Sequence, residues 1–325
     1  MKKIIITDYI NKPNIEKRLL KNFEIICLNE TNEKKFDKVI FDAFAILVWH
    51  AKITKRTISR LKKCKAIIRY GVGFDNIDLV ACKKKGIPFA NTPDYGTDEV
   101  SDTTIGFVLN MTRGINYYNY ISKNLTNTWQ ENIKNNLRRS NKVKIGIIGV
   151  GRIGSSVLIK LGNIGFQCSF YDPYKDPGYE KVLNCKRYFD LDQLLTNSDV
   201  VSIHVPLTTE TKGMINKNFI NKMKNNSYLI NTARGNLIDD LNDIYDALIN
   251  KKLDSVALDV LPTEPPSENN KLIKSWKKGN KISSRILITN HTSYYTLESF
   301  KEMRIKASQN ILNIANNKNL ISRII

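Results

Sequence analysis

The sequence predicts an α/β protein built from two domains with parallel sheets, and three observations lead to that prediction. Short β-branched runs alternate with longer segments whose apolar residues have helical spacing, as expected for strands joined by crossover helices. The alternation covers residues 1 to about 97 and resumes after residue 142. The chain has 325 residues and is 42% hydrophobic, so it is long enough to bury two cores.

In residues 1 to about 97, helix-start and helix-end residues agree with this prediction. Pro13 suits the first turn of a helix, and Gly86 suits a helix end. The strands are expected at residues 3–7, 24–28, 45–49, 66–70 and 88–91, and the helices at 13–21, 54–63 and 76–85.

A long helix is expected from Thr97 to about Lys123. Acidic residues fill its first turns and complement the helix dipole. The aromatic run 117–120 near its end is typical of a core or a subunit interface. Residues 124–141 are polar and are expected to form a loop.

The stretch 142–173 carries the strongest motif of the chain. A β-branched strand at 143–148 runs into Gly149, Gly151 and Gly154, which form G-x-G-x-x-G. The first glycine allows a tight turn, the second lets a backbone approach a pyrophosphate, and the third lets the following helix pack on the strand. A second strand at 166–171 ends in Asp172, where a ribose-binding carboxylate belongs. The stretch therefore predicts a Rossmann-type dinucleotide site.

The remainder of the chain continues the same pattern. A polar, lysine-rich loop is expected at 265–285. Strands are expected at 200–205, 228–231, 256–260 and 286–289, and helices at 240–250 and from 297 to about 316.

Composition argues against a membrane protein and a disulfide-rich protein, and the net charge needs an explanation. No stretch approaches the length of a membrane span, and the first apolar run is too short for a signal peptide. Five scattered cysteines without C-x-x-C indicate reduced thiols in a cytoplasmic protein, with neither a disulfide framework nor a metal site. The net charge of +20 suits nucleic acid or an anionic membrane, but the basic residues form short clusters spread along the chain. We therefore expect a compositional bias and no specific nucleic-acid site.

Further motifs fall at or beside expected strand ends, where open α/β sheets place their sites. They are RYGVGFDNIDL at 69–79, HVPLTTETKGMI at 204–215, NTARG at 231–235, DVLPTEP at 259–265 and TNHTSYYT at 289–296. Together with the glycine motif they resemble the D-isomer-specific 2-hydroxyacid dehydrogenase family over nearly the whole chain. PDYGTDEVSD at 93–102 and HTSYYTLES at 291–299 resemble its C-terminal-binding-protein-like branch.

The resemblance implies a catalytic set. Arg234 would bind the substrate carboxylate and polarise the reacting carbonyl, for which a planar guanidinium is suited. Glu264 would pair with His291, and His291 would deliver the proton to the carbonyl oxygen. An adjacent carboxylate favours the imidazolium form, so a proton is available near neutral pH. Backbone amides at Val72 and Gly73 would also hold the substrate carboxylate.

The resemblance also implies NAD as cofactor. The pyrophosphate would lie at the glycine turn with Arg152 and Ile153, and the adenosine ribose on Asp172. The residues implied at the adenine wall are Val205, Pro206 and Thr211, and those at the nicotinamide end are Thr232, Ala233 and Asp259.

The other two histidines, and the residue before His291, are not part of the expected catalytic set. His50 follows an apolar strand and is given no role, and His204 is interpreted as structural packing near the cofactor. The residue before the catalytic histidine is usually proline in this family, whereas here it is Asn290.

The sequence thus predicts a substrate-binding domain at 1–98 plus 292–325 and an inserted NAD-binding domain at 99–291, with the active site between them. The expected activity is interconversion of a 2-oxo acid and a D-2-hydroxy acid by hydride transfer. The family resemblance suggests a homodimer. The alternative function is an NAD(H)-responsive, corepressor-like binding protein with little or no catalysis.

Overall fold

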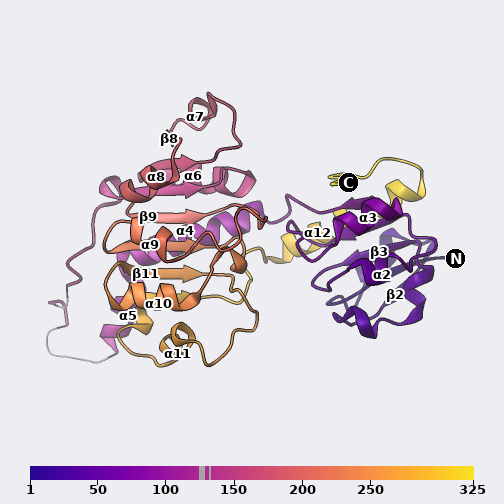
Figure 1. The fold of residues 1–325 in the computed structure, drawn as a ribbon, viewed down its shortest axis with the longest axis horizontal. Coiled ribbons are helices and arrows are strands. Elements are labelled where there is room, and N and C mark those ends of the chain that lie inside the picture. The colour runs from indigo at the N-terminus through magenta and orange to yellow at the C-terminus, as the bar shows by residue number, and fades with distance from the viewer. Residues whose placement is uncertain (124–128, 132) are drawn as a thin grey trace. The chain divides into compact units, whose positions relative to one another are not determined.

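The structure is a computed structural model that describes residues 1–123, 129–131 and 133–325. It divides into two compact units, one formed by Met1–Gly96 and Tyr295–Ile325 and the other by Thr97–Tyr294 (Figure 1). The second unit is inserted into the first. The sequence places the boundaries at 98/99 and 291/292, and the structure divides at 96/97 and 294/295.

The first unit contains a five-stranded parallel sheet in the order β2-β1-β3-β4-β5. Its strands are β1 (Lys2–Ile6), β2 (Phe23–Cys27), β3 (Ala45–Val48), β4 (Ala66–Arg69) and β5 (Phe89–Ala90). Its helices are α1 (Asn14–Leu19), α2 (Lys55–Ile58), α3 (Leu79–Lys85) and α12 (Leu297–Ala315), with 3₁₀ turns η1 (Glu33–Lys35) and η2 (Lys38–Asp42). The five expected strands are confirmed, and α3 ends at Gly86, which has φ +70° as expected for a left-handed helix end.

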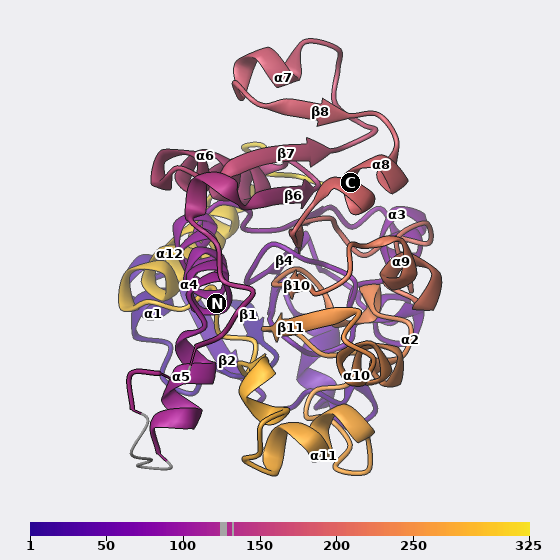
Figure 2. The ribbon, with the colours of Figure 1, turned by 90° about the vertical axis from the view of Figure 1, so that its left-hand side faces the viewer.

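The second unit contains a seven-stranded parallel sheet in the order β12-β11-β10-β9-β6-β7-β8. Figure 2 labels β8, β7, β6, β10 and β11 of this sheet. The strands are β6 (Lys144–Ile148), β7 (Gln167–Tyr171), β8 (Lys186–Tyr188), β9 (Val200–Ile203), β10 (Ser227–Asn231), β11 (Leu253–Leu258) and β12 (Ile286–Ile288). The helices are α4 (Thr97–Arg113), α5 (Ile115–Ser122), α6 (Arg152–Ile164), α7 (Tyr179–Val182), α8 (Leu191–Asn197), α9 (Lys217–Lys222), α10 (Leu241–Ile249) and α11 (Lys271–Lys277), with 3₁₀ turns η3 (Ser140–Lys142), η4 (Gly235–Leu237) and η5 (Ser283–Arg285).

The strand order fixes where this sheet can bind a ligand. The chain runs from β6 outward to β7 and β8, and then returns across β6 to β9 on its other side. The loops after β6 and β9 therefore diverge at the carboxyl edge, which is the switch point where open α/β sheets bind ligands. Two apolar clusters cover the two faces, one with α4 and α6 and the other with α8, α9 and α10.

Two expectations about local structure are wrong, and one strand was not expected. The helix expected from 97 to 123 breaks at Gly114, whose φ of +64° ends α4 and starts α5. The expected loop 265–285 contains α11, which Asn270 caps while Leu272 and Ile273 bury their side chains. Strand β8 was not foreseen, because three residues at a sheet edge give too short a pattern. The loop expected at 124–141 lies partly outside the described residues.

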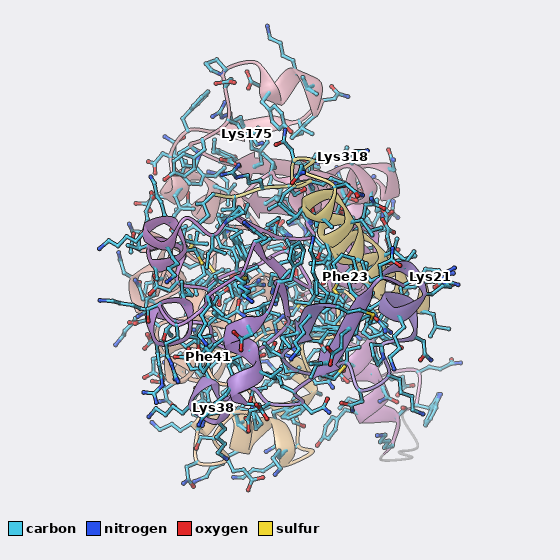
Figure 3. All side chains as sticks on the ribbon, turned by 90° about the vertical axis from the view of Figure 1, so that its right-hand side faces the viewer. Lys21, Phe23, Lys38, Phe41, Lys175 and Lys318 are labelled. Carbon is cyan, nitrogen blue, oxygen red and sulfur yellow. The ribbon has the colours of Figure 1, made fainter. Side chains whose placement is uncertain are left out.

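Basic side chains occur on several elements of the first unit. Lys21, Lys38 and Lys318 project from separate segments of this unit (Figure 3). All three are exposed. None of the helices in the described part of the chain is long and apolar enough to cross a membrane.

Candidate active site

The glycine turn after β6 has the geometry that the motif predicts. Gly149 has φ +87°, which side-chain-bearing residues rarely adopt, and its N–H donates to the Tyr171 carbonyl at 2.9 Å. A Cβ on Gly154 would lie 2.0 Å from the Gly149 oxygen, whereas a Cβ on Gly151 would meet no atom within 4 Å. The first and third glycines are therefore required by the fold, and the second leaves open space beside the backbone.

The N-terminus of α6 faces that open space. Gly151 is its N-cap, and Arg152 and Ile153 form its first turn, where amide groups lack intrahelical acceptors. Such an end favours an anion such as a pyrophosphate.

Asp172 is fixed at the end of β7 by two main-chain donors. Its Oδ2 accepts from the Val150 N–H at 2.9 Å, which ties it to the glycine turn, and its Oδ1 accepts from the Tyr174 N–H at 3.0 Å. Each carboxylate oxygen has a further lone pair, so the group can still accept from ribose hydroxyls.

The expected adenine wall follows β9. Val205 is half-buried, and its Cγ1 would lie 2.7 Å from a Cβ on Gly149, so it borders the glycine turn. Pro206 is exposed, and its carbonyl accepts from the Thr211 hydroxyl at 2.6 Å. The Thr211 side chain therefore closes its own turn, which positions Pro206.

The expected nicotinamide end lies at the carboxyl ends of β10 and β11. The Thr232 hydroxyl lies 3.1 Å from that of Thr104 on α4. Asn231 binds the Ala233 N–H at 3.0 Å and the Arg234 carbonyl at 2.9 Å, so one buried amide shapes the NTARG turn. The sequence analysis did not assign Asn231 this role, although a buried amide at a strand end is the signal that could have found it.

Asp259 is almost completely buried, and its carboxylate binds the loop that carries His291. Its Oδ1 accepts from the Thr289 hydroxyl at 2.6 Å and from the Thr292 N–H at 3.0 Å, and its Oδ2 accepts from the Ser293 N–H at 3.2 Å. The His291 N–H donates to the Asp259 carbonyl at 2.8 Å.

This anchoring holds His291 in an unusual conformation. Its φ is +58°, a left-handed value that costs a non-glycine residue energy and persists only where surrounding contacts enforce it. The contacts of Asp259 with Thr289, His291 and Thr292 provide this restraint.

His291 and Glu264 form a hydrogen-bonded pair. The His291 Nδ1 lies 2.8 Å from Glu264 Oε2, and Glu264 Oε1 accepts from the Leu261 N–H at 2.9 Å. Both side chains are partly accessible, at 38% and 39% exposed. The pairing through Nδ1 directs Nε2 to the opposite side of the ring, where it can meet a substrate.

Charges around Glu264 keep it ionised. Burial raises the pKa of its carboxyl, but the hydrogen bonds from His291 and Leu261 and the nearby charge of Arg234 outweigh burial, so the pKa lies below its ordinary value. An ionised Glu264 can hold a protonated imidazole.

Gly235 brings the arginine and glutamate segments together. A Cβ at this position would lie 1.9 Å from the Leu261 carbonyl oxygen and 2.6 Å from the Pro262 nitrogen. Only glycine allows the backbone after Arg234 to approach the segment that leads to Glu264.

His204 cannot serve as a proton donor near neutral pH. It is half-buried beside the Ser202 hydroxyl, 2.8 Å from its Nε2, and desolvation by the surrounding protein lowers its pKa to about 3. Its structural interpretation is consistent with this environment.

The first unit contains the turn to which Val72 and Gly73 belong. The Gly71 N–H donates to the Thr92 hydroxyl at 2.6 Å, and Asn91 donates to the Val72 carbonyl at 2.6 Å. Because the Gly71 N–H is already bonded to Thr92, the amides of this turn expected to bind a carboxylate are those of Val72 and Gly73. The Arg69 guanidinium lies where a Cβ on Gly71 would be, a neighbouring cation that the sequence analysis did not single out.

Comparison with known proteins identifies the family. Residues 105–293 match the model described as D-isomer specific 2-hydroxyacid dehydrogenase, NAD binding domain. The chain belongs to this family. The glycine turn, the open helix N-terminus and Asp172 fit the dinucleotide that such a domain binds.

Three individual proteins show how far the similarity extends. The chain is 34% identical to a glyoxylate reductase of Thermofilum pendens over 80% of this chain and 75% of that protein. It is 29% identical to C-terminal-binding protein 1 of Caenorhabditis elegans over 94% of this chain, but spans only 42% of that relative's length. Its fold matches a D-lactate dehydrogenase of Aquifex aeolicus, solved with NAD and lactic acid, with a TM-score of 0.82, 30% identity and coverage of 97% and 96% of the two chains.

In the described ranges 1–123, 129–131 and 133–325, no three His, Cys, Asp or Glu side chains gather as a metal site.

Proposed function

We propose that the protein is an NAD-dependent oxidoreductase that interconverts a 2-oxo acid and a D-2-hydroxy acid. The observation that carries this proposal is the 2.8 Å His291–Glu264 pair on the NAD-binding unit, with Arg234 close enough to lower the pKa of Glu264. An acid–base pair beside a guanidinium is the set that a 2-oxo acid requires, since the substrate presents a carboxylate next to a carbonyl.

Each residue would have a separate task. Arg234 binds the substrate carboxylate and draws electron density from the carbonyl. In the reduction direction His291 donates the Nε2 proton to the carbonyl oxygen, and Glu264 holds the imidazolium through Nδ1. NAD(H) supplies the hydride when bound.

The adenosine half of the site supports NAD over NADP. Asp172 would accept from the ribose hydroxyls, and its charge would repel a 2′-phosphate. Thr232 and Ala233 would border the nicotinamide ring, and Asp259 would hold that end in shape through the loop it anchors.

The test is NADH oxidation by the purified protein across a panel of 2-oxo acids that differ in side-chain size and charge. Turnover of one member, with the D-enantiomer as product, supports the proposal. If none is reduced while NADH binds, the alternative function gains support.

That alternative is an NAD(H)-responsive, corepressor-like binding protein. The observation favouring it is the 29% identity with C-terminal-binding protein 1 over 94% of this chain. The Arg234, Glu264 and His291 set argues against a purely binding role, because binding alone does not need a proton donor.

A homodimer would suit α5. Its residues Ile115–Ser122 are largely aromatic and apolar, and among the described residues most of them are only half-buried. Apolar side chains at this density are typical of a subunit interface. Sedimentation of the wild type and of Tyr117→Asp would test this, since a charge in the interface should favour the monomer.

A further inference from the structure

Arg187 donates hydrogen bonds to main-chain carbonyls of the turn at residues 172–176. It lies on the edge strand β8, and its side chain is only 5% exposed. Its Nη2 donates to the Asp172 carbonyl at 2.9 Å and to the Lys175 carbonyl at 2.7 Å, and its Nη1 donates to the Asp176 carbonyl at 3.0 Å. One guanidinium thus binds three carbonyls within five residues.

The same turn sets the direction of the Asp172 carboxylate. Its Oδ1 is held by the Tyr174 N–H, and Tyr174 lies between the carbonyls that Arg187 binds. Its Oδ2 is held by the Val150 N–H of the glycine turn. A movement of the turn would therefore change the position of Asp172 relative to the glycine turn.

The Arg187 guanidinium is surrounded by two aromatic rings and one carboxylate. The guanidinium carbon lies 4.7 Å from the centre of the Phe189 ring and 5.8 Å from that of Phe170, and Nη1 lies 3.8 Å from Glu180. A planar fork can reach several carbonyls from such a confined position, whereas a lysine ammonium cannot.

We propose that Arg187 is the positioning residue of the adenosine site, which holds Asp172 in the orientation that binds the ribose. The proposal rests on the proposed role of Asp172. It also explains why a guanidinium this near the ribose site need not favour NADP, because its donors are directed at main-chain carbonyls. From the sequence alone, this arginine would be taken as a partner for a 2′-phosphate and would predict a preference for NADP.

The test compares Arg187→Lys with Lys186→Ala, using ADP-ribose as the probe in calorimetry and NADH in steady-state assays. Lys186 is the neighbour on β8 and lies over the Tyr188 ring, 4.4 Å from its centre, so Lys186→Ala controls for the loss of a positive charge from the same strand. Arg187→Lys should weaken ADP-ribose binding about tenfold, the size of losing charge-assisted hydrogen bonds. Lys186→Ala should change the affinity for ADP-ribose less than about twofold. In both variants kcat at saturating NADH should also change less than about twofold.

A double-mutant cycle shows whether Arg187 acts through Asp172. In an Asp172→Ala background the additional loss caused by Arg187→Lys should shrink to less than about twofold. Amide hydrogen exchange gives a second readout, since the Val150 and Tyr174 amides should exchange faster in Arg187→Lys while β9 keeps its protection.

The outcomes separate this proposal from the one beneath it. If Asp172→Ala weakens ADP-ribose binding and Arg187→Lys does not, the positioning role is wrong and the cofactor site stands. An equal loss for Arg187→Lys in both backgrounds, or faster exchange throughout the sheet, also overturns the positioning role. If Asp172→Ala leaves the affinity intact, the ribose assignment falls together with it.

Discussion

The two ends of the NAD-binding unit are built in different ways. At the adenosine end, the glycine turn, the start of α6 and Asp172 all come from one stretch of chain, and β6 pairs directly with β7. At the proposed catalytic end, the groups come from three separate segments at 231–235, 259–264 and 289–293, which are joined by hydrogen bonds to one another. The glycine turn and Asp172 form a local unit, whereas the second set of groups depends on the order of strands in the sheet.

The difference predicts how each end should fail. A change at the adenosine end should weaken one ligand contact or disturb one turn. A change at the catalytic end should affect groups that come from distant parts of the sequence, because their loops hold one another.

The largest expected effect is that of His291→Ala. Loss of a general acid lowers kcat by roughly 10²–10⁴-fold, while NADH binding stays near wild type. Stopped-flow or steady-state reduction of the best 2-oxo acid measures it, with His204→Asn as the control for a half-buried histidine whose low pKa rules out proton donation. Near-full turnover of His291→Ala would place the proton donor elsewhere.

Arg234→Ala should come next and should differ in kind. It removes a contact made in both the ground state and the transition state, so KM should rise and kcat should fall, with a combined loss in kcat/KM of roughly 10²–10³-fold. A rise in KM alone would mean that the guanidinium binds the carboxylate without polarising the carbonyl.

Two glycines at the adenosine end form a matched pair. Gly154→Ala meets the Gly149 carbonyl at 2.0 Å and should lower the free energy of unfolding by about 1–3 kcal/mol. Gly151→Ala meets no neighbouring atom within 4 Å, so thermal unfolding should stay near wild type while the KM for NADH rises. Equal melting temperatures for the two variants would contradict the packing role of Gly154.

Asp172→Ala should reduce the preference for NAD over NADP. Hydrogen bonds to a charged group contribute about 1.5–3 kcal/mol, so the NADH KM should rise by roughly 10- to 100-fold, while NADPH, no longer repelled, should lose less. The measurement is the ratio of kcat/KM for the two cofactors. A ratio that does not move would show that other groups, such as Lys175, determine the preference.

Glu264→Gln should give the smallest loss of activity. Its neutral amide replaces the charged acceptor that Glu264 presents to His291 Nδ1, so the imidazole should be held less firmly and kcat should fall by roughly tenfold. A kcat equal to that of the wild type would argue against the pairing of Glu264 with His291.

The same substitution has a consequence for stability. Because the pKa of Glu264 lies below its ordinary value in the folded protein, its contacts contribute stability above the unfolded pKa, and that stability is lost as pH falls through the folded pKa. Chemical unfolding between pH 3 and 7 should therefore be less pH-dependent in Glu264→Gln than in the wild type. An identical acid limb would mean that the pair contributes little to folding.

By itself the sequence determined the parallel α/β architecture, the dinucleotide turn and the position of Asp172 along the chain. These follow from local rules: β-branched runs form buried strands, and glycine is required where φ is positive or where a carbonyl lies 2.0 Å from a would-be Cβ. Local rules failed at Gly114, where one left-handed residue divides a continuous helical pattern, and at β8, which is too short to have a pattern.

Only the tertiary structure decided how the functional groups are held. Nothing near Asp259 in the sequence indicates that its carboxylate binds residues 289–293, and nothing near Arg187 indicates that it binds the turn after Asp172. Both contacts connect neighbouring strands of one sheet, β11 with β12 and β7 with β8. Which strands become neighbours depends on how the whole sheet packs its two apolar faces, so these contacts are absent from any single stretch of sequence.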